Sequence, residues 1–322
     1  MTIPPRLHFF WIGKRLPWAY VFAVISAVER SEIPDIIFHH TDRLEDGAER
    51  SALEAEARVR MVRIDPAEYL AETGDRLGLA EAFVALYRRL ESPVARSDLL
   101  RAAILYREGG IYLDLDTVTI ASLLPLLDVR HFLGSELIVW PQRARTSRSP
   151  VVLSRHLVLD LVRKACRRIP HGWALFRQVE RFYTRSVNNA VMGAEAGSDL
   201  VANYLVGMVR ASPEQQTRRY GLGPDLLREV VRRYDHAALV IHRPAVFYPL
   251  APEISEHWFR IASRIRLRDV LSRETRVAHW YASVRTKALV AHITPGYVRR
   301  NRDRQLYSAL VCASIDEFTH AT

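Results

Sequence analysis

The sequence predicts an α/β fold with a mostly parallel central sheet, helices on its faces and a helical C-terminal extension. First, strand-like and helix-like segments alternate through roughly the first third of the chain, as they do in parallel α/β sheets. Second, 322 residues with 49% hydrophobic content are ample for one large core. Third, no run of about 18 apolar residues occurs, so no membrane-spanning helix is expected.

The N-terminal part of this alternation contains three expected strands and four expected helices. The segment 6–13 alternates loosely and is aromatic, 35–40 is short and apolar, and 59–64 alternates, so these are the strands. Helices are expected over 17–30, 50–57, 66–74 and 79–90.

A longer helix and a short strand should follow. Ser92 is a good N-cap, and Pro93 suits the first helical position. The double glycine at 109–110 should end the helix, because a left-handed C-terminal cap favours glycine. The strand expected over 111–113 then leads to a pair of acidic residues.

These acidic residues, Asp114 and Asp116, should lie at the C-terminal end of a sheet strand. α/β proteins bind charged ligands there, and carboxylate oxygens suit Mg²⁺ or Mn²⁺. Asp98 and Arg101 share one face of the preceding helix, where they would hold a ribose hydroxyl and a phosphate. The alternative is a structural ion pair beside a surface acidic turn.

The remaining two thirds of the chain are less regular. Strands are expected over 117–120, 131–139 and 238–242. The second of these is expected to be antiparallel. Helices are expected over 160–168, 173–183, 198–211 and 224–234. The last forty residues are basic and give no clear prediction.

The net charge of +10 favours anionic partners such as nucleotide diphosphates, acidic glycans or lipid phosphates. Arg163, Lys164, Arg167 and Arg168 predict a basic stripe on an amphipathic helix, which would suit peripheral contact with an anionic membrane. No recognisable nucleic-acid module accompanies them, so nucleic acid is not an expected partner.

Phosphate-binding glycine motifs are missing from the sequence, which argues against a Rossmann oxidoreductase and a P-loop NTPase. A metal ion with basic side chains is another way to neutralise a pyrophosphate. Prolines and charged residues interrupt the first ten positions, so no signal peptide is expected. The simplest interpretation is a cytoplasmic protein, with a peripheral position at the inner membrane face as a further expectation.

Three motifs carry a resemblance to a known family: IPPRLHFFWIG at 3–13, ARSDLLR at 95–101 and YLDLD at 112–116. Weaker matches follow at 189–192, 223–224, 247–249 and 278–280. Together they resemble the family 32 glycosyltransferases, which include yeast initiating mannosyltransferases and bacterial capsular-polysaccharide enzymes. The glucosylating domains of clostridial toxins are more distantly similar. The resemblance implies a GT-A fold, a nucleotide-sugar donor, a divalent metal and retention of anomeric configuration.

The resemblance also implies roles for individual residues. Trp11 would lie against the nucleobase, Asp114 would touch ribose and sugar hydroxyls, and Asp116 would be the direct metal ligand. Further donor contacts are implied for Ser97, Asp98, Arg101, Asn189 and Trp280. Catalytic roles fall on Asp114, Asp116 and Arg101, and Asn189 is expected to begin a loop near the sugar.

An additional metal ligand is expected from the C-terminal segment, where His279 is the best candidate beside Asp114 and Asp116. The spacing here is His-Trp where the family has His-x-Trp, and residues 283–285 stand where a Trp-Arg pair is expected. The metal role of His279 therefore stays open, with His242, His257 and His292 as competitors.

The implied function is a metal-dependent retaining glycosyltransferase that moves a hexose from a UDP or GDP sugar to a hydroxyl acceptor, such as a glycan or glycolipid. Residues 1–250 would form the catalytic domain, with the donor and metal half in 1–120 and the acceptor half in 121–250. Residues 251–322 would close over the donor site. No base residue is needed if the departing diphosphate oxygen deprotonates the acceptor.

A double displacement would instead need a carboxylate nucleophile, for which Glu195 is the candidate. Two other classes of function stay open. One is a sugar-nucleotide pyrophosphorylase, and the other is a non-catalytic basic module that binds glycan or membrane.

Overall fold

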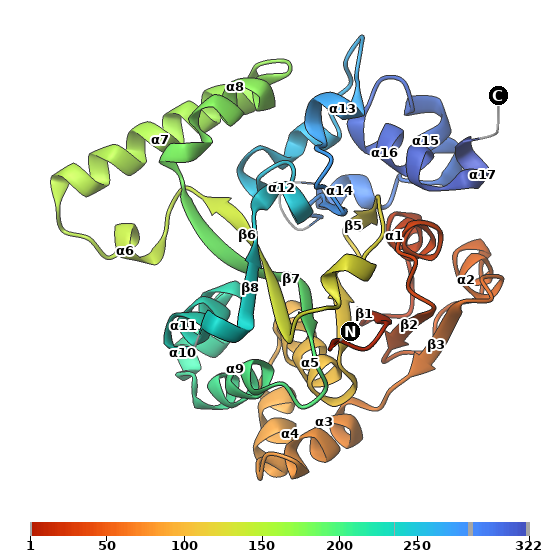
Figure 1. Cartoon of the computed structure of the whole chain (residues 1–322), viewed down its shortest axis with the longest axis vertical. Helices are drawn as coiled ribbons and strands as arrows, with labels where there is room; N and C mark the ends of the chain where they lie inside the picture. Colours follow the sequence, from red (N-terminus) through yellow and green to blue (C-terminus); the bar gives the residue numbers. More distant parts are fainter. Residues whose placement is uncertain (1, 235, 283–285, 320–322) are drawn as a thin grey trace.

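The structure is a computed structural model that describes residues 2–234, 236–282 and 286–319, without the side chains of 142, 236 and 319. In this described part, seven strands form one sheet in the order β3-β2-β1-β4-β7-β6-β8, and β5 and β9 form a small separate ladder. Helices lie around the sheet, and a group of short helices forms the C-terminal end (Figure 1). The predicted α/β class and the helical C-terminal extension are confirmed.

The parallel half of the sheet comes from the first third of the chain. Its strands are β1 (Arg6–Trp11), β2 (Asp35–His40), β3 (Val59–Arg63) and β4 (Gly110–Leu113). β1 lies between β2 and β4 and runs parallel to both. Because parallel strands end at the same edge of a sheet, the ends of β1 and β4 bring Trp11 and Asp114 to one edge.

The predicted helices of this half are confirmed to within a few residues: α1 (Trp18–Arg30), α2 (Ala48–Glu54), α3 (Pro66–Asp75), α4 (Ala80–Arg89) and α5 (Pro93–Glu108). The Ser92 side chain accepts a hydrogen bond from the Ala95 amide at the start of α5. The helix ends at Gly109 and Gly110, whose φ angles of 64° and 105° favour glycine. These two glycines turn the chain directly into β4.

The other half of the sheet contains antiparallel pairs. Its strands are β6 (His131–Ile138), β7 (Thr184–Ala194) and β8 (Leu239–His242). β7 lies antiparallel between β4 and β6, and β8 is parallel to β6. The expectation that Asn189 begins a loop is wrong, because Asn189 lies at the centre of β7. The polar run 184–189 is typical of a loop, but pairing of residues 184–188 with β6 holds it as a strand.

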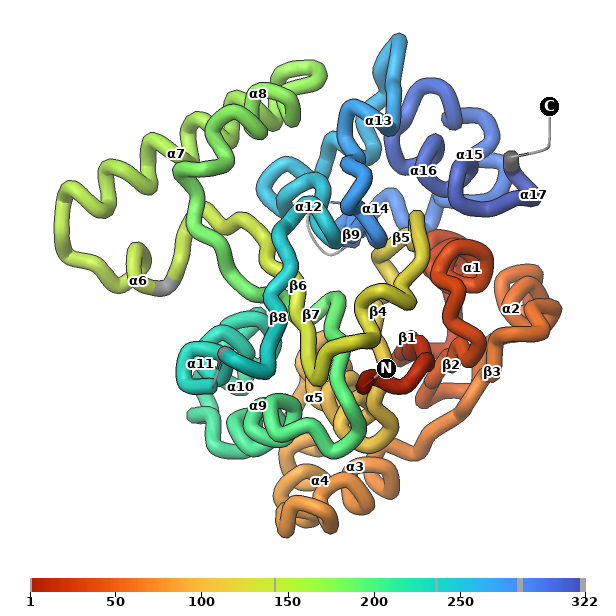
Figure 2. The backbone as a smooth tube through the Cα atoms, in the orientation of Figure 1, coloured from red at the N-terminus to blue at the C-terminus, as the bar shows by residue number. Residues whose placement is uncertain are grey.

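A short ladder joins the C-terminal segment to the acidic pair. β5 (Thr117–Thr119) pairs antiparallel with β9 (Val277–His279), in a register that places Thr117 opposite His279. The C-terminal helices follow, namely α13 (Leu267–Val270) before β9 and then α14 (Lys287–Val290), α15 (Pro295–Asn301), α16 (Leu306–Ser314) and α17 (Asp316–Thr319). Figure 2 shows this end of the chain beside α1.

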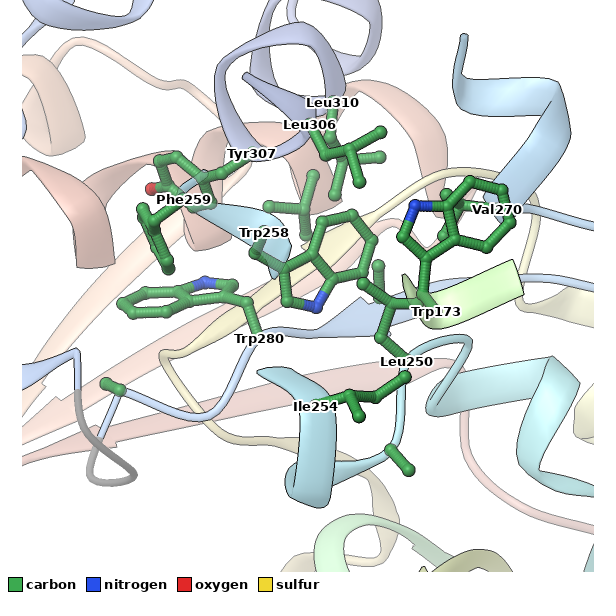
Figure 3. Packing of buried hydrophobic residues seen from close by; sticks show 14 of the residues in the cluster. Trp173, Leu250, Ile254, Trp258, Phe259, Val270, Trp280, Leu306, Tyr307 and Leu310 are labelled. Atoms are coloured by element: carbon green, nitrogen blue, oxygen red, sulfur yellow. The ribbon is translucent and has the colours of Figure 1, made fainter. Parts of the chain in front are cut away.

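An aromatic core fixes the C-terminal segment to the rest of the protein (Figure 3). Trp280 is fully buried there, with its ring centroid 5.5 Å from that of Phe259 and 5.2 Å from that of Tyr307. Trp258 is fully buried in the same cluster. Large aromatic side chains bury much apolar area, so the segment that carries His279 is held firmly.

A helical arm, residues 142–182, projects from the sheet between β6 and β7 (Figure 1). It contains α6 (Gln142–Arg145), α7 (Pro150–Arg168) and α8 (Gly172–Val179). α7 begins ten residues earlier than predicted, with Pro150 in its first turn.

The predicted basic stripe on α7 is wrong. Arg163 is buried and forms an ion pair of 2.9 Å with Glu253, and Arg167 lies 3.4 Å from Glu256. Two of the four basic residues therefore point toward the body of the protein.

Helices α9 (Asp199–Arg210), α10 (Pro213–Thr217) and α11 (Leu226–Arg233) lie near one another beside β7. Helix α12 (Pro244–Phe247) follows β8 and leads into the C-terminal segment. Over the described residues, no helix combines the length and the apolar character that a membrane crossing requires.

Candidate active site

The acidic pair lies between β4 and β5, where several backbone contacts fix it. The Asp114 amide donates to the Ala190 carbonyl of β7 at 2.8 Å. The Thr117 hydroxyl donates to the Asp114 carbonyl at 2.7 Å. The amide of Trp280 donates to the Asp116 carbonyl at 2.9 Å. The two side chains thus belong to a rigid turn and not to a loose surface loop.

His279 completes a group of possible metal ligands with the two aspartates. Its Nε2 atom lies 2.8 Å from Asp116 Oδ1, and the Ala282 amide donates to Asp116 Oδ2 at 2.7 Å. One ligand atom from each of Asp114, Asp116 and His279 lies within 4.8 Å of the others. Of the competing histidines, His257 donates from Nε2 to the Cys166 carbonyl, and His242 packs against Phe132. The ladder between β5 and β9 thus brings the favoured histidine to the acids.

The electrostatics of this group are those of a buried acid–imidazole pair. Burial lowers the pKa of His279, but the charge of Asp116 and their hydrogen bond outweigh it, so the pKa is raised. Burial raises the pKa of Asp116, but the charge and hydrogen bond of His279 leave it below its usual value. The buried Nδ1 atom of His279 has no hydrogen-bond partner among the described residues. Two carboxylates and an imidazole are a donor set that can hold a divalent cation.

The second charged group is built around Arg101 of α5. Its guanidinium lies 3.0 Å from Asp114 and 3.5 Å from Asp98, and it donates to the Asn189 carbonyl at 2.9 Å. Asn189 in turn donates from its amide group to Asp98 at 2.8 Å. Burial raises the pKa of Asp98 to about 6, against the opposing charge of Arg101. Ser97 lies 3.5 Å from the same guanidinium. Sequence-predicted residues of α5, β4 and β7 therefore meet at one point.

Two cavities meet at the charged residues. The β6 cavity, of about 500 Å³, is lined by residues that include Glu136, Trp140, Asp160, Arg163, Glu253 and Tyr281. The β1 cavity, of about 670 Å³, is lined by residues that include Trp11, Tyr20, Ser97, Ala282 and Lys287. Both cavities share Val94, Asp98, Arg101, Asp114, Asp116 and Tyr220. The acidic pair thus stands at the junction of two spaces, as a two-substrate site requires.

The two predicted tryptophans lie in different places. Trp11 is half-buried, lines the β1 cavity and packs against Tyr20 with ring centroids 5.1 Å apart. Trp280 lines neither cavity and is fully buried, so its predicted contact with the donor is wrong. Trp280 directly follows β9, and successive side chains of an extended chain point to opposite faces. His279 faces the acids, and Trp280 faces the core.

Glu136 is a site residue that the sequence did not reveal. It lies within β6, is buried, and accepts a hydrogen bond from the Tyr281 hydroxyl at 3.1 Å. Burial raises its pKa to about 6, and a hydrogen bond with Asn188 opposes that rise. An isolated glutamate inside an apolar strand was the available signal.

Lys287 in the β1 cavity and Arg163 in the β6 cavity were also missed. Glu195, the predicted alternative nucleophile, lines neither cavity and forms an ion pair with Arg130. The residues 283–285, compared above with a Trp-Arg pair, lie outside the described residues.

Comparison with known protein families finds a match that covers the part of the chain that contains the acidic pair. A family model described as "Glycosyltransferase sugar-binding region containing DXD motif" matches residues 39–133, which include Asp98, Arg101 and both acids. Residues 39–133 thus contain the DXD region of a glycosyltransferase. The motif resemblance to family 32 is a finer assignment and stays a prediction.

Solved structures agree on the fold of this glycosyltransferase. WbbM, a bifunctional glycosyltransferase in its apo form, is 10% identical with a TM-score of 0.51, covering 98% of this chain and 50% of that chain. The present chain therefore spans about half the length of WbbM. This likeness shows a GT-A fold, as the sequence predicts.

Weaker likenesses exist to two ligand-bound proteins. The UDP-bound glycosyltransferase domain of the YGT toxin is 10% identical with a TM-score of 0.41, covering 75% of this chain and 80% of that chain. The galactosyltransferase LgtC, in complex with donor and acceptor sugar analogs, is 15% identical with a TM-score of 0.39, covering 92% and 99%. Among curated protein sequences, none matches this chain significantly.

Proposed function

We propose that this protein is a metal-dependent retaining glycosyltransferase that transfers a hexose from a nucleotide diphosphate sugar to a hydroxyl acceptor. The observation that carries the proposal is the group of Asp114, Asp116 and His279, in which the two aspartates line both cavities. A donor in one cavity and an acceptor in the other would react beside these groups. Retention of configuration and transfer of a hexose rest on the sequence resemblance.

The β1 cavity is proposed to take the donor, a UDP or GDP sugar. Trp11 offers a flat indole face at the end of β1, which suits stacking of a base. Ser97 and Asp98 at the same wall offer oxygen atoms to ribose or sugar hydroxyls. Lys287 adds a cation on the C-terminal side, where it would attract the diphosphate.

Asp116, Asp114 and His279 are proposed to hold Mn²⁺ or Mg²⁺. A divalent cation at this position supplies Lewis-acid stabilisation of the negative charge on the departing diphosphate. Arg101 is fixed by Asp98 and Asp114, so its role is to hold these acids in place and to add positive charge near the donor. Asn189 is proposed to position Asp98 through their hydrogen bond.

The β6 cavity is proposed to take the acceptor, a glycan, a glycolipid or another hydroxyl compound. Glu136 and Asp160 present oxygen atoms, and Trp140 presents an aromatic surface, which are the groups that bind sugar rings. A diphosphate oxygen of the donor is proposed to take the acceptor proton, so that no base residue is required. A glycolipid acceptor would bring the protein into peripheral contact with an anionic membrane, at the inner face in a cytoplasmic setting.

The domain division is part of the same proposal. Residues 1–120 would hold the donor and 121–250 the acceptor. Residues 251–322 would close the donor site, since Ala282 and Lys287 line its cavity and His279 contacts Asp116.

The decisive variant is Asp116→Ala. We expect loss of Mn²⁺-dependent donor hydrolysis and transfer, because the proposed cation loses one of its ligands, while the protein stays folded. Asp303→Ala, whose side chain is 85% exposed, is the matched control and should keep activity. In the unaltered protein, Mn²⁺ with a hundredfold excess of UDP sugar over Kd should add about 2.7 kcal/mol of stability.

Normal turnover by Asp116→Ala would contradict the metal role. Pyrophosphate release from a nucleoside triphosphate would favour a pyrophosphorylase instead. Nuclear magnetic resonance of the product would show whether the anomeric configuration is retained.

A further inference from the structure

The helical arm carries an unusual concentration of exposed apolar side chains. Of thirteen exposed large hydrophobic residues in the described chain, eight lie in the arm, between positions 151 and 182. On α7 alone, the exposed fractions are 76% for Val151, 53% for Leu157, 57% for Val158 and 56% for Leu161. Scattered exposed apolar residues are ordinary on a protein surface, but a cluster on one helix indicates an interaction site.

These residues occupy the face of α7 where a solvated helix carries charge. Leu157, Val158 and Leu161 lie three and four positions apart, so they form one stripe. The opposite face carries the buried His156, Leu159 and Cys166. The helix is therefore apolar both toward the protein and toward solvent.

The outward stripe does not arise from loose packing, because the inner face is firmly attached. His156 Nδ1 lies 2.7 Å from the Val139 carbonyl, and the Tyr183 hydroxyl donates to the Leu159 carbonyl at 2.8 Å. His257 Nε2 lies 3.1 Å from the Cys166 carbonyl. Rotation of the helix to bury the stripe would break these contacts, so the stripe is presented permanently.

Positive charge borders the stripe. Arg155, Lys164 and Arg168 are exposed on α7, where Lys164 also pairs with Asp160 at 2.8 Å, and the whole chain carries a net charge of +10. A second copy of the chain would bring like charges together on this face. An anionic bilayer would instead accept the apolar side chains at its interface and attract the basic ones.

We propose that the α7 surface, formed by Val151, Leu157, Val158 and Leu161 with Arg155 and Lys164, docks on an anionic lipid bilayer. The other face of the same helix places Asp160 and Arg163 in the wall of the β6 cavity. A docked arm would thus hold the proposed acceptor cavity next to the membrane. Docking does not depend on the proposed glycosyl transfer, whereas delivery of a lipid-carried acceptor does.

The test is binding to vesicles of phosphatidylcholine with phosphatidylglycerol, compared with phosphatidylcholine alone, in a flotation assay. The unaltered protein should bind the anionic vesicles, and high salt should weaken the binding. Leu157→Glu with Leu161→Glu should weaken it at least tenfold, because two leucines no longer enter the interface. Ile261→Glu, at a residue 51% exposed outside the arm, is the matched control and should bind normally.

Three results would each overturn the proposal. The first is failure of the unaltered protein to bind vesicles, and the second is equal binding of vesicles by the double variant. The third is a dimer, seen in sedimentation, that the double variant abolishes. The double variant should keep its melting temperature, since both leucines are more than half exposed. It should also keep its response to UDP and Mn²⁺, so a failed docking proposal is distinguishable from a failed donor proposal.

Discussion

The wall that the two cavities share and the wall that β6 contributes differ in how they handle buried charge. On the wall shared with the β1 cavity, Asp98 and Asp114 both lie against the guanidinium of Arg101. In the β6 cavity, Glu136 is about as buried as Asp98, but its hydrogen-bond partners, Tyr281 and Asn188, are neutral. The first arrangement offsets part of the negative charge with a cation before any ligand binds. The second leaves a buried carboxyl group whose hydrogen-bond partners carry no charge.

This difference suits different ligands. A donor diphosphate brings its own negative charge, so its surroundings must be neutral or positive. An acceptor hydroxyl is neutral and needs a hydrogen-bond acceptor, which an ionised or partly ionised carboxyl provides. We infer that the ion pairs of Arg101 stabilise the folded protein and that the buried carboxyl group of Glu136 lowers its stability.

Arg101→Met should produce the largest loss of stability. The substitution leaves Asp98 and Asp114 buried without their cation, which typically costs about 3–5 kcal/mol. Chemical denaturation would measure this loss. Arg101→Met combined with Asp98→Asn should recover part of it, since one buried charge is removed. A loss below about 1 kcal/mol would show that solvent, and not Arg101, compensates these acids.

Glu136→Gln should raise the stability of the folded protein, whereas Arg101→Met lowers it. Burial raises the pKa of Glu136 from its usual 4.5 to about 6, so the folded state prefers the protonated form. Stability contributed by that proton is present below pH 4.5 and is lost as the pH rises through about 6. The glutamine variant should therefore gain about 2 kcal/mol at pH 7.5 and little at pH 4.5.

Thermal unfolding at several pH values would measure the gain from Glu136→Gln. Glu91→Gln, at an exposed position, is the control and should change little. If the gain in stability did not depend on pH, the pKa of Glu136 would not be raised in the folded protein. If Glu136 also contacts the acceptor, transfer should fall while binding of UDP is kept.

The sequence predicted the donor side of the site better than the acceptor side, for a physical reason. Asp98, Arg101, Asp114 and Asp116 lie within twenty residues on one helix–strand unit, whose caps and periodicity are local signals. Glu136 and Tyr281 come from segments that meet only through sheet pairing and the aromatic core. No local pattern encodes such a meeting, because long-range pairing decides it.

The wrong predictions have the same cause, because contacts between distant segments decide where these residues lie. Trp280 was predicted from a motif position, but it follows β9 with its side chain pointing away from that of His279 and into the core. The central placement of Asn189 in β7 was missed because its partners, β4 and β6, lie far away in the sequence. The basic stripe on α7 failed because the sequence does not show that Glu253 and Glu256 face Arg163 and Arg167.

The smallest predicted effect compares one tryptophan from each cavity. Trp11→Ala should weaken UDP binding by about 1–3 kcal/mol, which is the usual value of a base stacked on an aromatic ring. Trp140→Ala, in the β6 cavity, should leave UDP binding unchanged and weaken acceptor binding instead. Titration calorimetry in the presence of Mn²⁺ would measure both. Because the two residues are chemically identical, equal effects on UDP would show that the cavities do not divide the substrates, and a reversed pattern would exchange the donor and acceptor sides.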